Sequence, residues 1–346
     1  MGERPTLQTV ADRLGVSRAT VSNAYNRPDQ LSPALRERIL AAAHELGYSG
    51  PDPAARGLRL RRSGTVGVLL GESLTYAFRD PAAALFLEGI ARTGEQTGTS
   101  MLLIPSPVGD DQTTAVRNAV VDGFCIYCVS DSRHQLGAVM DRRLPTVLIE
   151  GDAIPGAARV DIDQQAGASA AAAHLRQLGH ERVAIIAERL LADHAVGWAS
   201  EQRITSATEP VSRGRVTGYR SVFPDAPVYE ARGNRFEAGY DAATVILDDH
   251  PEITAILAET DMLAFGTQRL AGERGLSIPH DLSLVGFDDI PPAVRNVPPL
   301  TTVRQPLTEK GVVAYQLLQE LLADQPARSV VLPVELIVRE STAPPR

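Results

Sequence analysis

Four residues near the start of the chain have side chains suited to contacting the bases of a nucleic acid. On a helical wheel of about 100° per residue, Arg18, Ala19, Ser22 and Asn23 share one arc, opposite an apolar arc. An arginine guanidinium can donate to the acceptor edge of guanine, an asparagine amide can pair with adenine, and an alanine methyl can touch thymine. The arc therefore fits the major groove of DNA, although a polar helix face that meets only water has the same pattern.

Three short helices are predicted to position this arc. Thr6 can cap the first helix, which ends at Gly15, and Ser17 can cap a second helix that runs to about Tyr25 across a tight turn. A third helix begins at Ser32, with proline in its first turn. The apolar residues recur at helical spacing, and we expect the three helices to bury Leu7, Val10, Ala11, Leu14, Val21, Ala24, Tyr25, Leu35, Ile39, Ala42, Ala43 and Leu46.

The charge of the chain is divided unevenly along its length. Residues 1–64 contain ten Arg against six Asp and Glu, a net charge of +4, and the remaining residues carry −12 of the total of −8. A basic segment on an acidic body is typical of a protein whose basic part binds a polyanion. Charge alone would equally suit a solvated helix face.

The segment that follows the third helix is rich in Pro, Ala and Gly. Asp52 can cap and Pro53 can begin a short helix over residues 54–59, which is too short to be stable without a partner. We therefore expect a hinge that becomes ordered on binding. Several arginines follow it and are expected to lie along DNA phosphates, or else to be exposed tether charges: Arg56, Arg59, Arg61 and Arg62.

Several classes of protein are excluded by the sequence. No apolar run approaches the roughly 20 residues of a membrane span, and no signal peptide is recognisable, so we expect a cytoplasmic protein. Cys125 and Cys128 lie in one strand-like run and point to opposite faces, which argues against a zinc or redox site. No nucleophile elbow, phosphate loop or zinc-protease motif occurs, so we expect neither an enzyme nor a cofactor.

From residue 65 onward, apolar strand-like runs alternate with helical patterns. Such alternation predicts parallel sheets covered on both faces, and its length suggests two sheets. The predicted strands are 65–70, 100–104, 121–128, 145–149, 182–187, 254–258 and 281–286, and the predicted helices lie near 82–96, 112–119, 164–178, 236–249 and 261–273.

Ligands of such sheets bind beyond the carboxyl ends of the strands. Loop residues there are candidates for a binding site, namely Asp80, Glu150, Arg215, Thr260 and Asp288. Arg215 can donate to a hydroxyl pair or a carboxylate, and Asp288 can accept from ligand hydroxyls. Each of these residues could instead be an ordinary helix cap or surface charge.

The first 50 residues resemble the DNA-binding head of the LacI (lactose/galactose repressor) family. The matching stretches are Thr6-Leu-Gln-Thr-Val-Ala, Gly15-Val-Ser-Arg-Ala-Thr-Val-Ser and Ser32-Pro-Ala-Leu-Arg-Glu-Arg-Ile-Leu-Ala-Ala-Ala-His-Glu-Leu-Gly-Tyr48. The resemblance implies that the second helix enters the major groove. The DNA-binding residues it implies are Thr6, Ser17, Arg18, Ala19, Thr20, Ser22, Asn23, Arg56 and Leu58, with Asn23 standing where many relatives have arginine.

The hinge resembles the family's hinge helix through Pro53-Ala-Ala-Arg-Gly-Leu58. In the family this helix folds on the operator and inserts a leucine, here Leu58, into the minor groove, which kinks the duplex. Gly57 replaces a serine common there, which makes the hinge more flexible. Leu58 could alternatively dock on the large domain.

The remaining chain resembles the periplasmic-binding-protein-like core of the same family. Matching pieces include Asp80-Pro81, Val121-Asp-Gly-Phe and Pro299-Leu-Thr-Thr302. The resemblance implies two subdomains, crossed three times by the chain, that clasp an effector. Asn234 replaces a frequent aromatic residue, for which Phe78, Tyr76 or Trp198 could compensate, and residues 189–213 resist alignment. The implied effector-binding residues are Phe78, Asp80, Glu150, Arg215, Asn234, Thr260 and Asp288.

Together these patterns predict an all-α helix-turn-helix head followed by an α/β core of two parallel-sheet subdomains. The expected domains are 1–50 (head), 51–64 (hinge helix and linker) and 65–346 (core), with subdomains of about 65–162 plus 292–322 and about 163–291 plus 323–346. We expect a homodimeric transcriptional regulator, a repressor, that binds double-stranded operator DNA and is controlled by a sugar-like effector. The helix near 306–322 and the face around 82–97 are predicted dimer contacts. The alternative is a sugar-binding protein whose head contacts another protein.

Overall fold

The computed structural model of the chain describes residues 5–51, 62–71, 73–105, 113–129, 134–193 and 195–346. The chain divides into two compact units, Met1–Gly64 and Thr65–Arg346. The predicted hinge helix, with Arg56 and Leu58, lies outside the described residues. Among the described helices, none combines the length and apolar character needed to cross a membrane.

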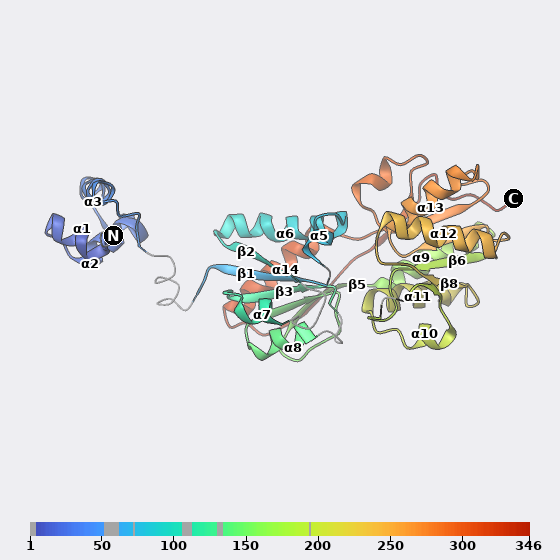
Figure 1. Cartoon of the computed structure of the whole chain (residues 1–346), viewed down its shortest axis with the longest axis horizontal. Coiled ribbons are helices and arrows are strands. Elements are labelled where there is room, and N and C mark those ends of the chain that lie inside the picture. The colour runs from blue at the N-terminus through green and yellow to red at the C-terminus, as the bar shows by residue number, and fades with distance from the viewer. Residues whose placement is uncertain (1–4, 52–61, 72, 106–112, 130–133, 194) are drawn as a thin grey trace. The chain divides into compact units, whose positions relative to one another are not determined.

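The first unit is a cluster of three α-helices with a short 3-10 turn (Figure 1). The helices are α1 (Leu7–Leu14), α2 (Arg18–Asn26) and α3 (Pro33–Glu45), with η1 (Pro28–Gln30) between the last two. Each helix begins where the sequence predicts, because Thr6, Ser17 and Ser32 accept hydrogen bonds from first-turn amides at 3.3, 3.0 and 3.3 Å. The predicted apolar residues form one core, in which Val10, Ala11, Val21, Ala24, Ile39, Ala42 and Ala43 are buried.

The second unit contains two mainly parallel sheets, as predicted. The six-stranded sheet has the order β12-β5-β4-β3-β1-β2, and every paired strand in it is parallel. Its apolar central strands are covered by helices, which explains their continuous hydrophobic runs. The strands are β1 (Thr65–Leu70), β2 (Ser100–Ile104), β3 (Gly123–Tyr127), β4 (Thr146–Ile149), β5 (Ala158–Ile162) and β12 (Ser329–Leu332). The helices of this lobe are α5 (Leu74–Ala77), α6 (Pro81–Thr97), α7 (Thr114–Asn118), α8 (His134–Asp141) and α14 (Leu307–Leu322) (Figure 1).

The seven-stranded sheet has the order β13-β11-β10-β9-β6-β8-β7, with antiparallel pairs only at its two edges. The strands are β6 (Val183–Ala187), β7 (Gly197–Trp198), β8 (Val228–Glu230), β9 (Ala255–Ala258), β10 (Ser283–Asp288), β11 (Thr301–Arg304) and β13 (Glu335–Ile337). The helices are α9 (Gln164–Gln177), α10 (Glu201–Thr205), α11 (Pro210–Val222), α12 (Phe236–Asp249) and α13 (Asp261–Glu273), with the 3-10 turn η2 (Pro291–Val294).

The expected assignment of two segments to subdomains is wrong. β11 pairs with β10, with Val285 opposite Thr301, so residues 301–304 belong to the seven-stranded sheet. β12 pairs with β5, with Ser329 opposite Arg159, so residues 329–332 belong to the six-stranded sheet. The chain therefore crosses between the sheets after β5, after β11 and after β12. The predicted number of three crossings agrees, but the second and third crossings lie further along the chain than expected.

The helices predicted to make the dimer contact, α6 and α14, pack against each other within the chain. A Cβ added to Gly89 of α6 would lie 2.0 Å from the carbonyl oxygen of Thr308, and one added to Gly311 of α14 would lie 2.1 Å from that of Phe86. The backbones of the two helices are thus in direct contact, and only their outer faces remain for a second copy. The dimer contact stays a prediction.

Candidate functional site

In the head, the residues predicted to read bases lie on the face of α2 that its core leaves open. Arg18 and Ala19 are exposed, whereas Val21 and Ala24 on the opposite arc are fully buried. Ser22 and Asn23 are half-buried. The helix therefore presents one basic and one small apolar side chain at its amino-terminal end, where the helix dipole also favours phosphate.

The other predicted head residues are already engaged in hydrogen bonds. The hydroxyls of Ser17 and Thr20 lie 2.8 Å apart, and the hydroxyl of Thr6 lies 3.1 Å from that of Thr9. Asn23 donates to Gln30 at 3.2 Å, so its amide must exchange this bond for one to a base edge. The bond between Ser17 and Thr20 thus fixes the end of α2 that carries Arg18 and Ala19.

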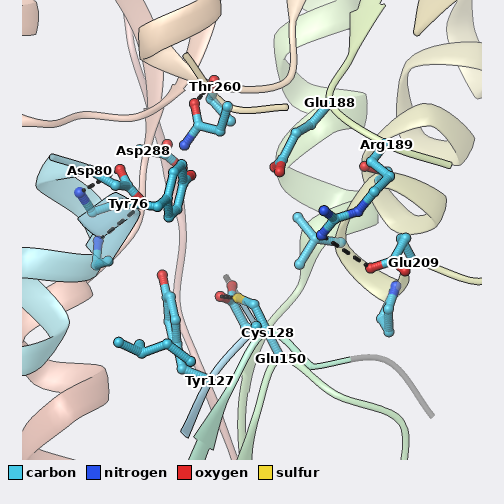
Figure 2. Close-up of a pocket in the computed structure, with 18 of the residues that line it drawn as sticks. Tyr76, Asp80, Tyr127, Cys128, Glu150, Glu188, Arg189, Glu209, Thr260 and Asp288 are labelled. Carbon is cyan, nitrogen blue, oxygen red and sulfur yellow. Dashed lines mark hydrogen bonds and ion pairs between the residues drawn. The ribbon is translucent and has the colours of Figure 1, made fainter. Parts of the chain in front are cut away.

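A cavity of about 90 Å³ lies where the carboxyl ends of strands from both sheets face each other, and we call it the inner cavity. Figure 2 shows Tyr127, Cys128 and Glu150, which lie at or just after the ends of β3 and β4, facing Glu188, Thr260 and Asp288. The second group lies at or just after the ends of β6, β9 and β10. The described residues lining it are Leu70, Gly71, Tyr76, Ala77, Asp80, Ala82, Ala83, Tyr127, Cys128, Glu150, Glu188, Arg189, Glu209, Pro210, Val211, Ser212, Arg215, Asn234, Thr260, Asp288 and Gln305.

Arg215 is the central donor of this cavity. It is 3% exposed and its Nη1 lies 3.4 Å from Oδ1 of Asp288. Its Nε donates to Gln164 at 2.8 Å, and its guanidinium stacks 3.7 Å from the ring centroid of Phe287. The predicted partners Arg215 and Asp288 are therefore brought together, in an orientation fixed by packing and by hydrogen bonds.

Burial shifts the ionisation of two carboxyls in the cavity. The pKa of Asp80 is raised to about 6, mainly by burial, although its carboxylate accepts amide hydrogen bonds from Ala82 and Ala83. The pKa of Asp288 is raised to about 7 by burial, against the lowering effect of Arg215. Both groups thus change charge near neutral pH unless a ligand satisfies them.

Glu150 is held in its charged form. Burial alone would raise the pKa of Glu150, but Lys310 and Arg215 outweigh it and leave the pKa lowered. Lys310 is fully buried and its Nζ lies 2.5 Å from Oε1 of Glu150, which also accepts from Gln164 at 2.6 Å. Cys128 donates its thiol to the other carboxylate oxygen at 3.3 Å. This carboxylate is thus a preoriented acceptor at the cavity wall.

Two further predicted residues lie in the cavity wall and bond to each other. The Thr260 hydroxyl donates to the side-chain oxygen of Asn234 at 2.7 Å and also caps α13 through Leu263. Both residues are less than a tenth exposed.

Phe78 is the predicted effector residue that the structure does not place in the cavity. Its side chain is 70% exposed and it is absent from the cavity lining. Trp198, the other proposed compensating aromatic residue, instead donates to Asp249 at 2.8 Å and packs edge-on against Tyr229. Tyr76, which was also proposed, does line the cavity, together with Tyr127. The short helix α5 brings Tyr76 to the cavity and leaves Phe78 at the surface, so an effector-binding role of Phe78 stays a prediction.

Sequence reasoning missed several cavity residues. Lys310 falls on the apolar stripe of α14, and a lysine at such a position is a readable sign of a buried ion pair. Glu188, Arg189 and Glu209 come from the border of the segment that resisted alignment, where no local pattern indicated a role. Glu209 is 6% exposed, and its Oε1 has no hydrogen-bond partner among the described residues.

The cavity suits a polar organic ligand better than a metal ion. Within the described ranges, no three His, Cys, Asp or Glu side chains are placed to hold a metal. Five carboxyls line the cavity against two guanidiniums. Carboxylates accept hydrogen bonds and guanidiniums donate them, so the walls match a ligand rich in hydroxyl groups.

An exposed recognition helix on a small head, followed by two sheets that enclose a polar cavity, defines a ligand-responsive DNA-binding regulator. Residues 6–50 match the description "Bacterial regulatory proteins, lacI family", and residues 172–342 match "Periplasmic binding protein-like domain". The chain is 39% identical to the HTH-type transcriptional regulator Rv3575c of Mycobacterium tuberculosis, over 99% of this chain and 98% of that protein.

Two solved structures extend the similarity. The Lac repressor dimer bound to operator and an anti-inducer has a TM-score of 0.80 at 25% identity, covering 99% of this chain and 100% of that chain. The complex of the transcriptional regulator CelR with cellobiose has a TM-score of 0.70 at 26% identity, covering 98% and 100%.

The chain belongs to the lacI family of bacterial transcriptional regulators. Its predicted fold class and its predicted function as a DNA-binding transcriptional regulator are confirmed, and the family consists of regulators and not of enzymes. The alternative in which the head contacts another protein is not supported by these matches.

Proposed function

We propose that the chain is a repressor that binds a near-palindromic operator as a homodimer and is controlled by a small polyhydroxylated effector in the inner cavity. The observation that carries this proposal is the Arg215–Asp288 pair, at 3.4 Å, which α11 and the carboxyl end of β10 present to the inner cavity. The Lac repressor dimer bound to operator and the CelR complex with cellobiose support the same mode of action.

The cavity is the place where an effector can act on the whole core, because residues from both sheets line it. A ligand hydroxyl that bonds to Asp80 of one lobe and Asp288 of the other favours one arrangement of the lobes. The ligand shifts the population only as far as it prefers that arrangement. In a dimer, such a shift changes the spacing of the two heads and hinges, and with it operator affinity.

Selection of bound fragments from random duplex DNA by the full chain tests the proposal. We expect two mirror-related half-sites, protected together in a footprint and released or strengthened by one member of a panel of sugars and polyols. Affinity for random duplex is expected to fall steeply with salt, because it rests on phosphate contacts. Selected fragments without two-fold symmetry, or a complete absence of salt-dependent binding, would contradict the proposal.

A further inference from the structure

A second cavity adjoins the inner cavity. It measures about 320 Å³, and we call it the outer chamber. The two cavities share Tyr76, Glu188 and Arg189 in their walls. Figure 2 shows Glu188 and Arg189 on the side of the inner cavity opposite Tyr76 and Asp80. A ligand that fills the narrow inner cavity can therefore extend between these side chains into the wider chamber.

The two cavities differ in charge. Five carboxyls and two guanidiniums line the inner cavity, whereas the described residues of the outer chamber include three arginines and one carboxylate. The arginines are Arg189, which pairs with Glu209 at 3.6 Å, and the exposed Arg232 and Arg235. Hydroxyl groups suit the first environment, and an anion suits the second.

Arg232 and Arg235 have no ion pair with any described carboxylate. The Arg235 guanidinium donates to the backbone carbonyl of Arg232, at 2.7 Å from Nη2, and the Arg232 side chain makes no hydrogen bond to any described residue. Elsewhere in the described core, arginines such as Arg203, Arg220 and Arg339 pair with carboxylates. Two adjacent cations at one cavity without an acidic partner leave that charge available to a ligand.

The backbone adds to this positive potential. Arg235 is the N-cap residue of α12, a helix of 14 residues, and no side chain caps its first-turn amides. Uncapped amides at a helix N-terminus favour a negative group. The positive φ of Gly233, 82°, bends the chain so that Arg232 and Arg235 lie on the same short turn.

An independent observation indicates that the adjoining inner cavity is incomplete without a ligand. Oε1 of Glu209 has no hydrogen-bond partner among the described residues, although this residue is 6% exposed and lines the inner cavity. An unsatisfied buried carboxylate oxygen is costly, and a ligand hydroxyl would satisfy it. Its partner Arg189 lies in the wall that both cavities share.

We propose that the outer chamber binds an oxyanion, a phosphate or a carboxylate, carried by the effector whose hydroxyl-bearing part occupies the inner cavity. This inference rests on the proposed function of the inner cavity as the effector site. It assigns Arg232 and Arg235 as residues that select a charged effector over its neutral counterpart.

The first test measures inorganic phosphate alone, by line broadening of its ³¹P resonance at constant ionic strength. The variant is R232S/R235S, and the matched control is R117S/R295S, which removes two exposed arginines of the core that line neither cavity. We expect phosphate affinity of the core to fall by about tenfold or more in R232S/R235S, as for loss of charge-assisted hydrogen bonds, and to stay unchanged in the control. Equal broadening in the two variants would overturn the inference.

The second test compares glucose, glucose 6-phosphate and glucuronate by titration calorimetry of the full chain. We expect one of the charged sugars to bind with about tenfold or more higher affinity than glucose, and this difference to be lost in R232S/R235S. The charged sugar that gains affinity identifies the oxyanion that the site prefers. If both charged sugars bind with the same affinity as glucose, the inference is overturned and the inner cavity remains the effector site. An Arg215 variant that loses glucose binding but still binds phosphate would show that the inner cavity and the outer chamber bind their ligands separately.

Discussion

At the scale of single residues, the inner cavity depends on charged groups that are buried in pairs. Arg215 faces Asp288, Lys310 faces Glu150, and Arg189 faces Glu209. A buried charge without its partner is strongly disfavoured, so each pair both holds the wall together and offers remaining hydrogen-bonding capacity to a ligand. The spare capacity is what distinguishes a binding site from a structural ion pair.

The substitution Arg215→Ala is expected to abolish the effector response and to leave operator binding intact. Loss of a charge-assisted donor to the ligand should weaken effector binding by about ten- to hundredfold. Calorimetry with the effector, beside a gel-shift titration with operator, measures both properties. R339A is the matched control, because it breaks the half-buried Arg339–Asp289 pair at 2.6 Å outside the cavity. An undiminished calorimetric signal in R215A would refute the role of Arg215.

The stability of the core is expected to fall as the pH rises from about 4 to about 7. Burial raises the pKa of Asp80 to about 6 and the pKa of Asp288 and of Glu259 to about 7. Each folded carboxyl keeps a proton that the unfolded chain has lost, so the free energy of unfolding decreases with pH between the two pKa values. The slope is at most about 1.4 kcal/mol per pH unit for each group.

Urea unfolding of the full chain at several pH values checks this dependence. The variant E259Q should show a shallower slope than the parent chain, because one of the titrating groups is gone. The exposed-site variant E273Q serves as control, since Glu273 has a lowered pKa and lies on the surface. Equal slopes in E259Q and the parent chain would contradict the raised pKa of Glu259.

At the scale of elements, the contact of α6 with α14 sets the shape of the first lobe. Gly89 and Gly311 are placed where the two helix backbones meet, so any larger side chain must push the helices apart. α14 also carries Lys310 beneath the cavity, at 2.5 Å from Glu150. Helix packing and the electrostatics of the site are therefore coupled through one helix.

The substitution Gly89→Ala is expected to destabilise the core by about 1–3 kcal/mol, as for overpacking of a close contact. The added Cβ would lie 2.0 Å from the carbonyl oxygen of Thr308, and backbone atoms cannot rotate away. Urea unfolding measures the change. The control is Gly137→Ala in α8, where a Cβ meets nothing within 4 Å and the helix is expected to gain about 0.5–1 kcal/mol. Equal stability of the two variants would contradict the packing argument.

At the scale of the whole molecule, DNA binding and ligand binding lie in separate compact units. The basic segment 1–64 has a net charge of +4 and the core −12, so the segment that carries the recognition helix is the part attracted to the DNA backbone. The two units are joined along the chain by the predicted hinge, which makes the hinge the natural place to test the proposed mechanism.

The substitution Leu58→Ala is expected to weaken operator binding and to reduce DNA bending. The resemblance to the family's hinge assigns Leu58 to the minor groove, where an apolar wedge unstacks a base step and kinks the duplex. A gel-phasing assay measures the bend, and a parallel salt titration should show an unchanged slope, because no phosphate contact is removed. Unchanged bending would count against the wedge.

The sequence by itself determined the features that depend on near neighbours along the chain. The caps Thr6, Ser17 and Ser32 and the apolar stripe around Val21 and Ala24 act within about four residues, so the three head helices were predictable. The long apolar runs of the central strands were likewise predictable, since burial on both faces requires them. Asp80, Glu150, Arg215, Asn234, Thr260 and Asp288 could be nominated because they follow strands or match a family.

Only the tertiary structure decided features that depend on residues far apart. The sheets that receive residues 301–304 and 329–332 are set by pairing with β10 and β5, which no local pattern records. Phe78 lies at the surface and Glu209 lies in the cavity wall. Both positions likewise follow from how whole helices pack. Capping hydrogen bonds and hydrophobic periodicity depend on residues that are close in the sequence. The geometry of a cavity depends on the packing of elements that are far apart in the sequence.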